Sequence, residues 1–177
     1  MENFEIEIKL PIEKPEEILE KLLGQGFLET GHIKEDDMYY NSEYHDVRKY
    51  DEALRIRKSE DLRTGEKKAQ INFKGKKIDR VSMSRREYET GVEDPDQMNE
   101  ILTAIGFFPA AGVEKIRRYL KRERMTACLD QVKGLGNFLE LEVIVQEESQ
   151  REKCLAEMKE LLEKLGIDGS LLTSLGG

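Results

Sequence analysis

Several residue types are scarce or missing in this chain, and their scarcity narrows its class. Tryptophan is absent, and there are only two cysteines and four prolines among 177 residues. Cys128 and Cys154 form no Cys-x-x-Cys pair, which argues against a zinc site or a disulfide framework and favours a reduced, cytoplasmic compartment. No apolar run approaches the ~18 residues of a membrane-spanning helix, and the first residues lack the order of a signal peptide. We therefore predict a cytoplasmic protein with no membrane partner.

An excess of positive charge is missing as well. Lys and Arg total 29 against 37 Asp and Glu, so the formal net charge is −8. This balance argues against a general nucleic-acid partner, whose affinity would rest on a basic surface. Charged residues nevertheless make up 37% of the chain and hydrophobic residues 38%, which is enough for one core. We expect a single domain over residues 1–177 with some of its charge inside.

Alternation of apolar and charged residues is what the chain has in abundance. Segment 4–10 reads FEIEIKL, with Glu5, Glu7 and Lys9 on one face of a strand and apolar residues on the other. The same criteria predict eight strands, at residues 5–10, 37–41, 53–58, 67–74, 82–90, 113–123, 125–132 and 138–146.

Three amphipathic helices are predicted outside these strands. The first begins at Pro15 and ends near Gly26, the second begins after Asp94 and ends at Gly106, and the third covers about residues 150–165. A weak internal repeat accompanies them, because segments 5–10 and 87–92 are each followed by a proline, a helix and a Gly-Phe pair. The spacings within the two copies differ, so the repeat only hints at a sheet built from two halves.

The charged positions of the strands are expected to share one face of the sheet. The apolar positions between them, including Ile56, Phe73, Ile116 and Leu141, would then pack under the helices. A solvated outer face is the commonest fate of such alternation. Two features argue for an enclosed face instead: the basic residues are mostly arginines or close pairs, and Glu-x-Glu occurs near both chain ends. Eight strands can close into a barrel with this face inside.

A tunnel lined in this way would suit a polyanion held together with a metal ion. Buried charges are costly unless they are paired, so an enclosed charged face calls for a charged ligand. Carboxylate oxygens are the ligands that Mg²⁺ or Mn²⁺ needs, and Arg and Lys donate charge-assisted hydrogen bonds to phosphate.

The order of these motifs resembles that of a known family over nearly the whole chain. The segments that carry the resemblance are Glu5-x-Glu7-x-Lys9, Ala53-Leu54-Arg55-Ile56-Arg57, Lys74-Gly75, Arg85-x-Glu87, Val113-Glu114-Lys115-x-Arg117-x-Tyr119, Leu129-Asp130-x-Val132-x-Gly134-Leu135-Gly136-x-Phe138 and Glu140-x-Glu142. They are similar to the CYTH superfamily of triphosphate tunnel metalloenzymes and, within it, to the class IV, CyaB-type adenylate cyclases. The resemblance implies an α+β fold, a closed eight-stranded antiparallel β-barrel with helices packed outside.

The resemblance also implies a role for each tunnel residue. The divalent metal, Mg²⁺ or Mn²⁺, would be held by Glu5, Glu7, Asp130, Glu140 and Glu142. The triphosphate would be bound by Lys9, Arg55, Arg57, Lys74, Arg85, Lys115 and Arg117, of which Lys9, Arg55, Arg57, Lys115 and Arg117 would also serve catalysis. Glu87 matches a further acid of unsettled role. Glu35 stands where the family usually has glutamine, which puts contacts on the nucleotide side in doubt.

Three functions stay open at this point. The first is a class IV adenylate cyclase that converts ATP to cyclic AMP and pyrophosphate; the second is a triphosphatase for inorganic, thiamine or nucleoside triphosphate. The third is a non-catalytic protein that binds polyphosphate or phosphometabolites. The tunnel residues serve either reaction, because phosphoryl transfer depends mainly on positioning and electrostatics. A homodimer is also left open.

Overall fold

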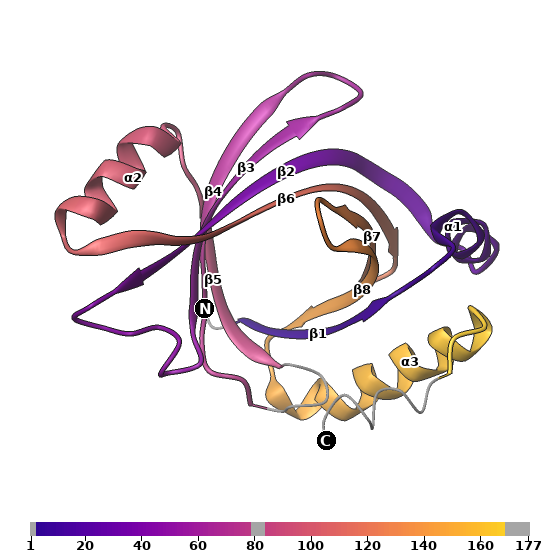
Figure 1. Cartoon of the computed structure of the whole chain (residues 1–177). Coiled ribbons are helices and arrows are strands. Elements are labelled where there is room, and N and C mark those ends of the chain that lie inside the picture. Colours follow the sequence, from indigo (N-terminus) through magenta and orange to yellow (C-terminus); the bar gives the residue numbers. More distant parts are fainter. Residues whose placement is uncertain (1–2, 79–83, 169–177) are drawn as a thin grey trace.

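The barrel predicted from the alternation is present in a computed structural model, which describes residues 3–78 and 84–168. The elements follow one another as β1 (Asn3–Pro11), α1 (Pro15–Gly24), β2 (Leu28–Ser42), β3 (Ala53–Asp61), β4 (Lys67–Lys74), β5 (Arg85–Gly91), α2 (Pro95–Ala104), β6 (Phe107–Arg122), β7 (Met125–Val132), β8 (Gly136–Val145) and α3 (Arg151–Lys164) (Figure 1). The strands close a barrel in the order β1-β5-β4-β3-β2-β6-β7-β8, and every pairing is antiparallel. The fold class expected from the sequence is confirmed.

Two strands extend well beyond their predicted limits. β2 begins at Leu28 rather than at residue 37, and β6 begins at Phe107 rather than at residue 113. The extra residues of β2 pair with residues 114–121 of β6, and the extra residues of β6 pair with residues 38–42 of β2. This ladder has register irregularities between Glu29 and Gly31 and between Tyr39 and Tyr40. These irregularities break the period-two pattern, so alternation does not reveal the strand ends. The predicted start of β5 at residue 82 lies outside the described residues.

The helices begin and end close to the predicted positions. The Asp94 side chain accepts a hydrogen bond of 3.0 Å from the backbone N–H of Gln97 and caps α2, which then starts with Pro95. Gly26 and Gly106 have φ values of 89° and 103°, a left-handed conformation that glycine adopts at little cost after a helix. None of the helices in the described residues is long and apolar enough to cross a membrane.

The apolar faces of the strands point outward, toward the helices. The main core joins β1, β7 and β8 to α1 and α3 and includes Ile6, Leu141 and Leu162, all of which have no exposed surface. A second, smaller core lies under α2, around Tyr40, Ile56 and Leu102. In Figure 1, α1 lies at the right-hand end of the barrel, α3 lies below β1, and α2 lies on the left, beside the start of β6.

Two apolar residues expected under the helices are not covered by them. Ile116, on the outer face of β6, is 39% exposed, and Phe73 is half-buried and stacks on the exposed Tyr88 instead of joining either core. The predictions that Ile116 and Phe73 pack under the helices are therefore wrong. The reason is that the three α-helices of the described residues cannot cover the whole outside of an eight-stranded barrel.

The two halves of the barrel are related by an internal two-fold axis. If each of β1–β4 is exchanged with the strand four places later in the chain, the same circular strand order results, read in the opposite direction. In β1 and β5, and in β2 and β6, residues eighty positions apart correspond, and two such pairs face each other in register: Glu5 with Arg85, and Glu35 with Lys115. The axis therefore passes through these two pairs. The internal repeat suggested by the sequence is present, but Glu5 corresponds to Arg85 and not to residue 87, so the alignment along β5 differs by two residues.

Candidate active site in the barrel interior

The charged faces of the strands line a tunnel inside the barrel. Its main chamber is about 310 Å³ and a second chamber is about 180 Å³. Both chambers are lined by Glu5, Glu7, Tyr39, Arg55 and Lys74. A larger groove of about 790 Å³ lies outside the tunnel, against the start of α2, and its acidic and basic residues form no comparable cluster.

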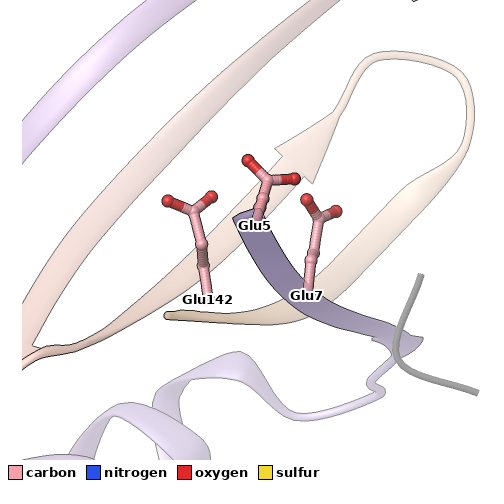
Figure 2. Close-up of side chains that lie close together, drawn as sticks. All are labelled: Glu5, Glu7 and Glu142. Atoms are coloured by element: carbon pink, nitrogen blue, oxygen red, sulfur yellow. The ribbon is translucent and has the colours of Figure 1, made fainter. Parts of the chain in front are cut away.

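Three carboxylates from the two ends of the chain meet in this tunnel. Glu5 and Glu7 occupy alternate positions of β1 and so point to the same face, while Glu142 lies on β8 directly opposite Glu7. One oxygen from each carboxylate lies within 4.8 Å of the other two, and Figure 2 shows the three groups gathered on one side of the strands. The antiparallel pairing of the first and last strands creates this cluster.

Burial and mutual repulsion disfavour the ionised forms of the carboxylates in this cluster. Burial, followed by the charges of Glu5, Glu140 and Glu7, raises the pKa of Glu142 well above its ordinary value. Burial likewise raises the pKa of Glu5. A divalent cation would relieve both effects, and carboxylate oxygens are hard ligands of the type that Mg²⁺ and Mn²⁺ require. The residues therefore fit such an ion.

Lys74 is the cation that contacts the cluster. Its Nζ lies 2.5 Å from Oε1 of Glu5 and 3.2 Å from Oε2 of Glu7. Burial would lower the pKa of Lys74, but the charges of Glu7 and Glu5 outweigh it and raise the pKa well above the usual value. Arg85, also predicted to bind substrate, lies 3.5 Å from Asp51 at the second chamber.

Arg57 is fixed by a buried two-pronged ion pair. Its Nε and Nη2 donate to the two oxygens of Asp37 at 2.7 and 2.9 Å, and Nζ of Lys115 lies 3.3 Å from the same carboxylate. The Asp37 side chain has no exposed surface. Burial would raise the pKa of Asp37, but the hydrogen bond from Arg57 and the neighbouring positive charges lower it to about 2. Asp37 therefore stays ionised and orients Arg57.

Arg117 is held in the same manner from the other side. Its Nε and Nη2 each donate to Asp130 at 2.6 Å, and Nη2 also donates to Glu140 at 2.5 Å. The side chain of Asp130 has no exposed surface. Asp130 and Glu140 were predicted as metal ligands, yet in the structure they contact Arg117 and do not belong to the carboxylate cluster of Glu5, Glu7 and Glu142. Their role as ligands stays a prediction.

Glu35 connects Arg57 and Arg117 from a buried position that lines neither chamber of the tunnel. Its carboxylate lies 3.3 Å from Arg57 and 3.6 Å from Arg117, and it accepts a hydrogen bond of 2.5 Å from the Tyr119 hydroxyl. The sequence marked Glu35 only as an unusual residue. Its position between the two arginines follows from the register with Lys115 on the two-fold axis, which a single strand pattern does not reveal.

Two tunnel cations have no acidic partner within the described residues. Arg55 is 7% exposed, and its Nε has no hydrogen-bond acceptor there. Nζ of Lys9 lies 5.4 Å from the ring centre of Phe138 and forms no ion pair in that part of the chain. Because a buried cation without a partner is costly, Arg55 is prepared to bind an anion, and the half-buried Lys9 in the same chamber can bind one as well.

Glu87 and Glu89 share the Asn72 amide, and Glu87 also lies close enough to Glu5 of the carboxylate cluster to add to the effect of burial in raising the pKa of Glu5. The Asn72 amide donates to Glu87 at 2.6 Å and to Glu89 at 3.2 Å. Oε2 of Glu87 is buried and has no hydrogen-bond partner in the described residues. The structure thus places Glu87 in the tunnel, as the alternation predicted, but outside the carboxylate cluster.

Comparison with known proteins matches this chain to one domain family. The sequence profile of the CYTH domain matches residues 3–173. A protein of Methanocaldococcus jannaschii named "putative adenylate cyclase" is 37% identical over 164 residues, which are 93% of this chain and 90% of that protein.

Solved structures share the same fold. The PH1819 protein of Pyrococcus horikoshii has a TM-score of 0.84 and 33% identity, with 93% of this chain and 91% of that chain covered. A Hippeastrum protein, described as a "putative adenylyl cyclase" with a dominant triphosphatase activity, has a TM-score of 0.64 and 20% identity, with 93% and 88% covered. At that identity the second likeness concerns the fold alone.

Proposed function

Because this chain belongs to the CYTH domain family, we propose that its tunnel is the active site of a divalent-metal-dependent enzyme acting on a triphosphate, and that it converts ATP to cyclic AMP and pyrophosphate. One observation carries the proposal: a cluster of three carboxylates lies in the same tunnel as Arg55 and Lys9, which have no acidic partner in the described residues. A polyanion that brings its own metal ion satisfies both groups at once.

The carboxylate cluster would hold the metal. Glu5, Glu7 and Glu142 offer oxygens close enough together to bind one Mg²⁺ or Mn²⁺. The bound ion would supply Lewis acidity, which neutralises phosphate charge and acidifies an attacking hydroxyl.

The basic residues would bind the phosphate chain. Arg55 and Lys9 can donate to phosphate oxygens without breaking an existing ion pair. Burial, followed by the charges of Arg117 and Arg57, lowers the pKa of Lys115, and an arriving phosphate would oppose that shift. Lys115, Arg57 and Arg117 would therefore stabilise the negative charge that develops on the leaving group.

In the cyclase reaction, the 3′-oxygen of the ribose forms a new bond to the α-phosphorus. The bond from the α-phosphorus to the bridging oxygen breaks, pyrophosphate leaves with that electron pair, and the hydroxyl proton passes to solvent. The tunnel residues contribute alignment and charge stabilisation, and no protein nucleophile is needed. The name of the M. jannaschii relative, "putative adenylate cyclase", supports this reaction.

A triphosphatase reaction is the second candidate. The main chamber is lined mostly by charged side chains, with Tyr39 and Tyr119 as its aromatic residues. Such a lining favours the phosphate chain over an organic group. Water would then attack the terminal phosphorus of inorganic, thiamine or nucleoside triphosphate, and the bond from that phosphorus to its bridging oxygen would break. The diphosphate would leave with that electron pair, the water proton would pass to solvent, and orthophosphate would be the second product.

Product analysis tests these alternatives directly. The protein is incubated with ATP, thiamine triphosphate or inorganic tripolyphosphate, each with Mg²⁺ or Mn²⁺, and the products are separated. Cyclic AMP with pyrophosphate supports the cyclase, whereas a diphosphate with orthophosphate supports the triphosphatase. Binding of tripolyphosphate without turnover of any substrate would identify a non-catalytic binding protein and overturn both reactions. The variant Arg55→Ala serves as a control for contaminating activity.

A further inference from the structure

Lys74 contacts the same carboxylates that fit the metal. Its Nζ lies within hydrogen-bond distance of both Glu5 and Glu7, and its side chain is 16% exposed. Two of the three members of the carboxylate cluster are thus already bound by an ammonium group of the protein itself.

We propose that Lys74 and the divalent ion compete for Glu5 and Glu7, so that the tunnel selects a metal–triphosphate complex over either component alone. Metal binding displaces the ammonium group, which then binds a phosphate oxygen of the same substrate. This inference rests on the proposed metal site and names the form of substrate that the site prefers.

Simple electrostatics supports the competition. Nζ of Lys74 lies 2.5 Å from Glu5 and 3.2 Å from Glu7, so a dication bound by the same carboxylates would repel the ammonium group at short range in a low-dielectric interior. The ammonium group and the metal therefore cannot share the same oxygens. Metal binding without any other change would leave Lys74 buried and unpaired, which is costly.

The displaced ammonium group needs a new acceptor, and two lie within reach of β4. One is Glu87, which faces Lys74 in the β4–β5 ladder and has a buried oxygen without a hydrogen-bond partner in the described residues. The other is a phosphate in the tunnel, because Lys74 lines both chambers. Only the second destination couples the two ligands, since linkage requires that each ligand improve binding of the other by the same factor.

Metal binding without triphosphate gives the first test. Mn²⁺ binding is measured by calorimetry on the wild type, on Lys74→Met, and on the control Lys77→Met. Lys77 lines the second chamber, but its Nζ lies 3.7 Å from Asp51 and not at the cluster. We expect Lys74→Met to bind Mn²⁺ about tenfold more tightly than the wild type, and Lys77→Met to change affinity by less than about twofold. Equal or weaker Mn²⁺ binding by Lys74→Met would overturn the proposal.

Coupling between the ligands gives the second test. Binding of a non-hydrolysable tripolyphosphate analogue is measured with and without Mn²⁺, with free ion concentrations held by a metal buffer. In the wild type, Mn²⁺ should tighten analogue binding by about tenfold more than it does in Lys74→Met. The same enhancement in both proteins would show that Lys74 moves to Glu87 or stays in place, and the coupling would be refuted.

Chemical labelling of the wild type makes the inference independent of the variant's folding. Acetic anhydride should modify Lys74 faster when Mn²⁺ is present, while the rate at Lys77 stays constant; unchanged labelling of Lys74 would contradict displacement. The results also distinguish failure of the proposed metal site from failure of this inference alone. A wild type that binds no Mn²⁺ refutes the proposed metal site together with this inference, whereas normal Mn²⁺ binding and turnover with no effect of Lys74 refutes this inference alone.

Discussion

The two flanks of the tunnel, β3–β4 and β7–β8, occupy equivalent places in the fold and carry opposite charge. The two-fold axis and the strand registers equate Arg55 with Cys128, Arg57 with Asp130, Asn72 with Glu140, and Lys74 with Glu142. The β3–β4 flank has no inward acid, and the β7–β8 flank has no inward base, in the described residues. One flank suits an anion and the other suits a cation.

The buried ion pairs show the same inversion in detail. In the first half the arginine, Arg57, comes from the flank strand β3 and the acid, Asp37, from β2. In the second half the acid, Asp130, comes from the flank strand β7 and the arginine, Arg117, from β6. The backbone thus supplies a position for an ion pair in each half, and the sequence decides which end of the pair lies on which strand.

Removing a carboxylate from the acidic flank should have the largest effect on activity. Glu142→Gln removes a negative ligand while keeping its shape, so we expect metal affinity and activity at fixed Mg²⁺ to fall at least about a hundredfold, with partial recovery at high Mn²⁺. Because burial and repulsion raise the pKa of Glu142, the variant should melt at the same or a higher temperature without metal. Rates measured against Mg²⁺ and Mn²⁺ concentration, with melting curves, check both. Unaltered metal dependence would make Glu142 an ordinary strand residue.

Removing a base from the opposite flank should act on the phosphate and spare the metal. Arg55→Ala loses a charged donor that has no acid to compensate, so kcat/KM should fall by about 10–100-fold while the Mg²⁺ concentration for half-maximal rate stays the same. Arg55→Lys, which keeps the charge but not the two-pronged geometry, should recover part of the loss. If Arg55→Ala changed the metal requirement instead, the division of labour between the flanks would be wrong.

The two buried aspartates offer a matched test of the inverted ion pairs. Asp37→Asn and Asp130→Asn each break a two-pronged contact with arginine, so both should lower the free energy of unfolding by about 3 kcal/mol and weaken triphosphate binding about tenfold. Denaturant unfolding and tripolyphosphate binding measure these effects. We expect neither variant to shift the metal requirement, since both carboxylates are taken by arginines. A shift in Asp130→Asn alone would establish Asp130 as a ligand, as the family resemblance implied.

The smallest expected effect concerns acid stability. The pKa of Asp37 in the folded protein, about 2, is below its unfolded value, so its stabilising contribution is complete above about pH 4 and is lost as pH falls toward 2. The loss should amount to about 2 kcal/mol. Comparing unfolding of the wild type and Asp37→Asn between pH 5 and 2 measures it. The difference between the two proteins should shrink as the pH falls, and a constant difference would refute the assigned pKa.

Much of the fold could be predicted because a strand pattern has a strict period of two. In β1, Glu5, Glu7 and Lys9 share one face, and this alone separates the charged interior from the apolar outside. Proline and the Asp94 cap similarly located the helices. The first part of β6 escaped prediction because Pro109 and Gly112 are poor strand residues, and they are held there by pairing with β2.

The pairing inside the tunnel could not be read in the same way. Alternation places Asp130 on the inner face, but whether it meets a metal or Arg117 depends on the register between β6 and β7. Glu35 escaped for a similar reason, since its contacts come from Arg57, Arg117 and Tyr119 on two other strands. The resemblance to a family supplied a role for each residue, whereas only the structure supplies its partners.

The two-fold axis also bears on how such a barrel could be assembled from pieces. If two copies of the first half-chain paired through this axis, each residue on the axis would face the same residue of the other copy. Glu35 would then oppose Glu35, and Glu5 would oppose a second Glu5 instead of Arg85. Linking the halves in one polypeptide lets Lys115 oppose Glu35 and Arg85 oppose Glu5. The first and second half-barrels, produced as separate fragments, should therefore form a heterodimer in preference to either homodimer. The opposite charges that face each other across the axis favour this pairing.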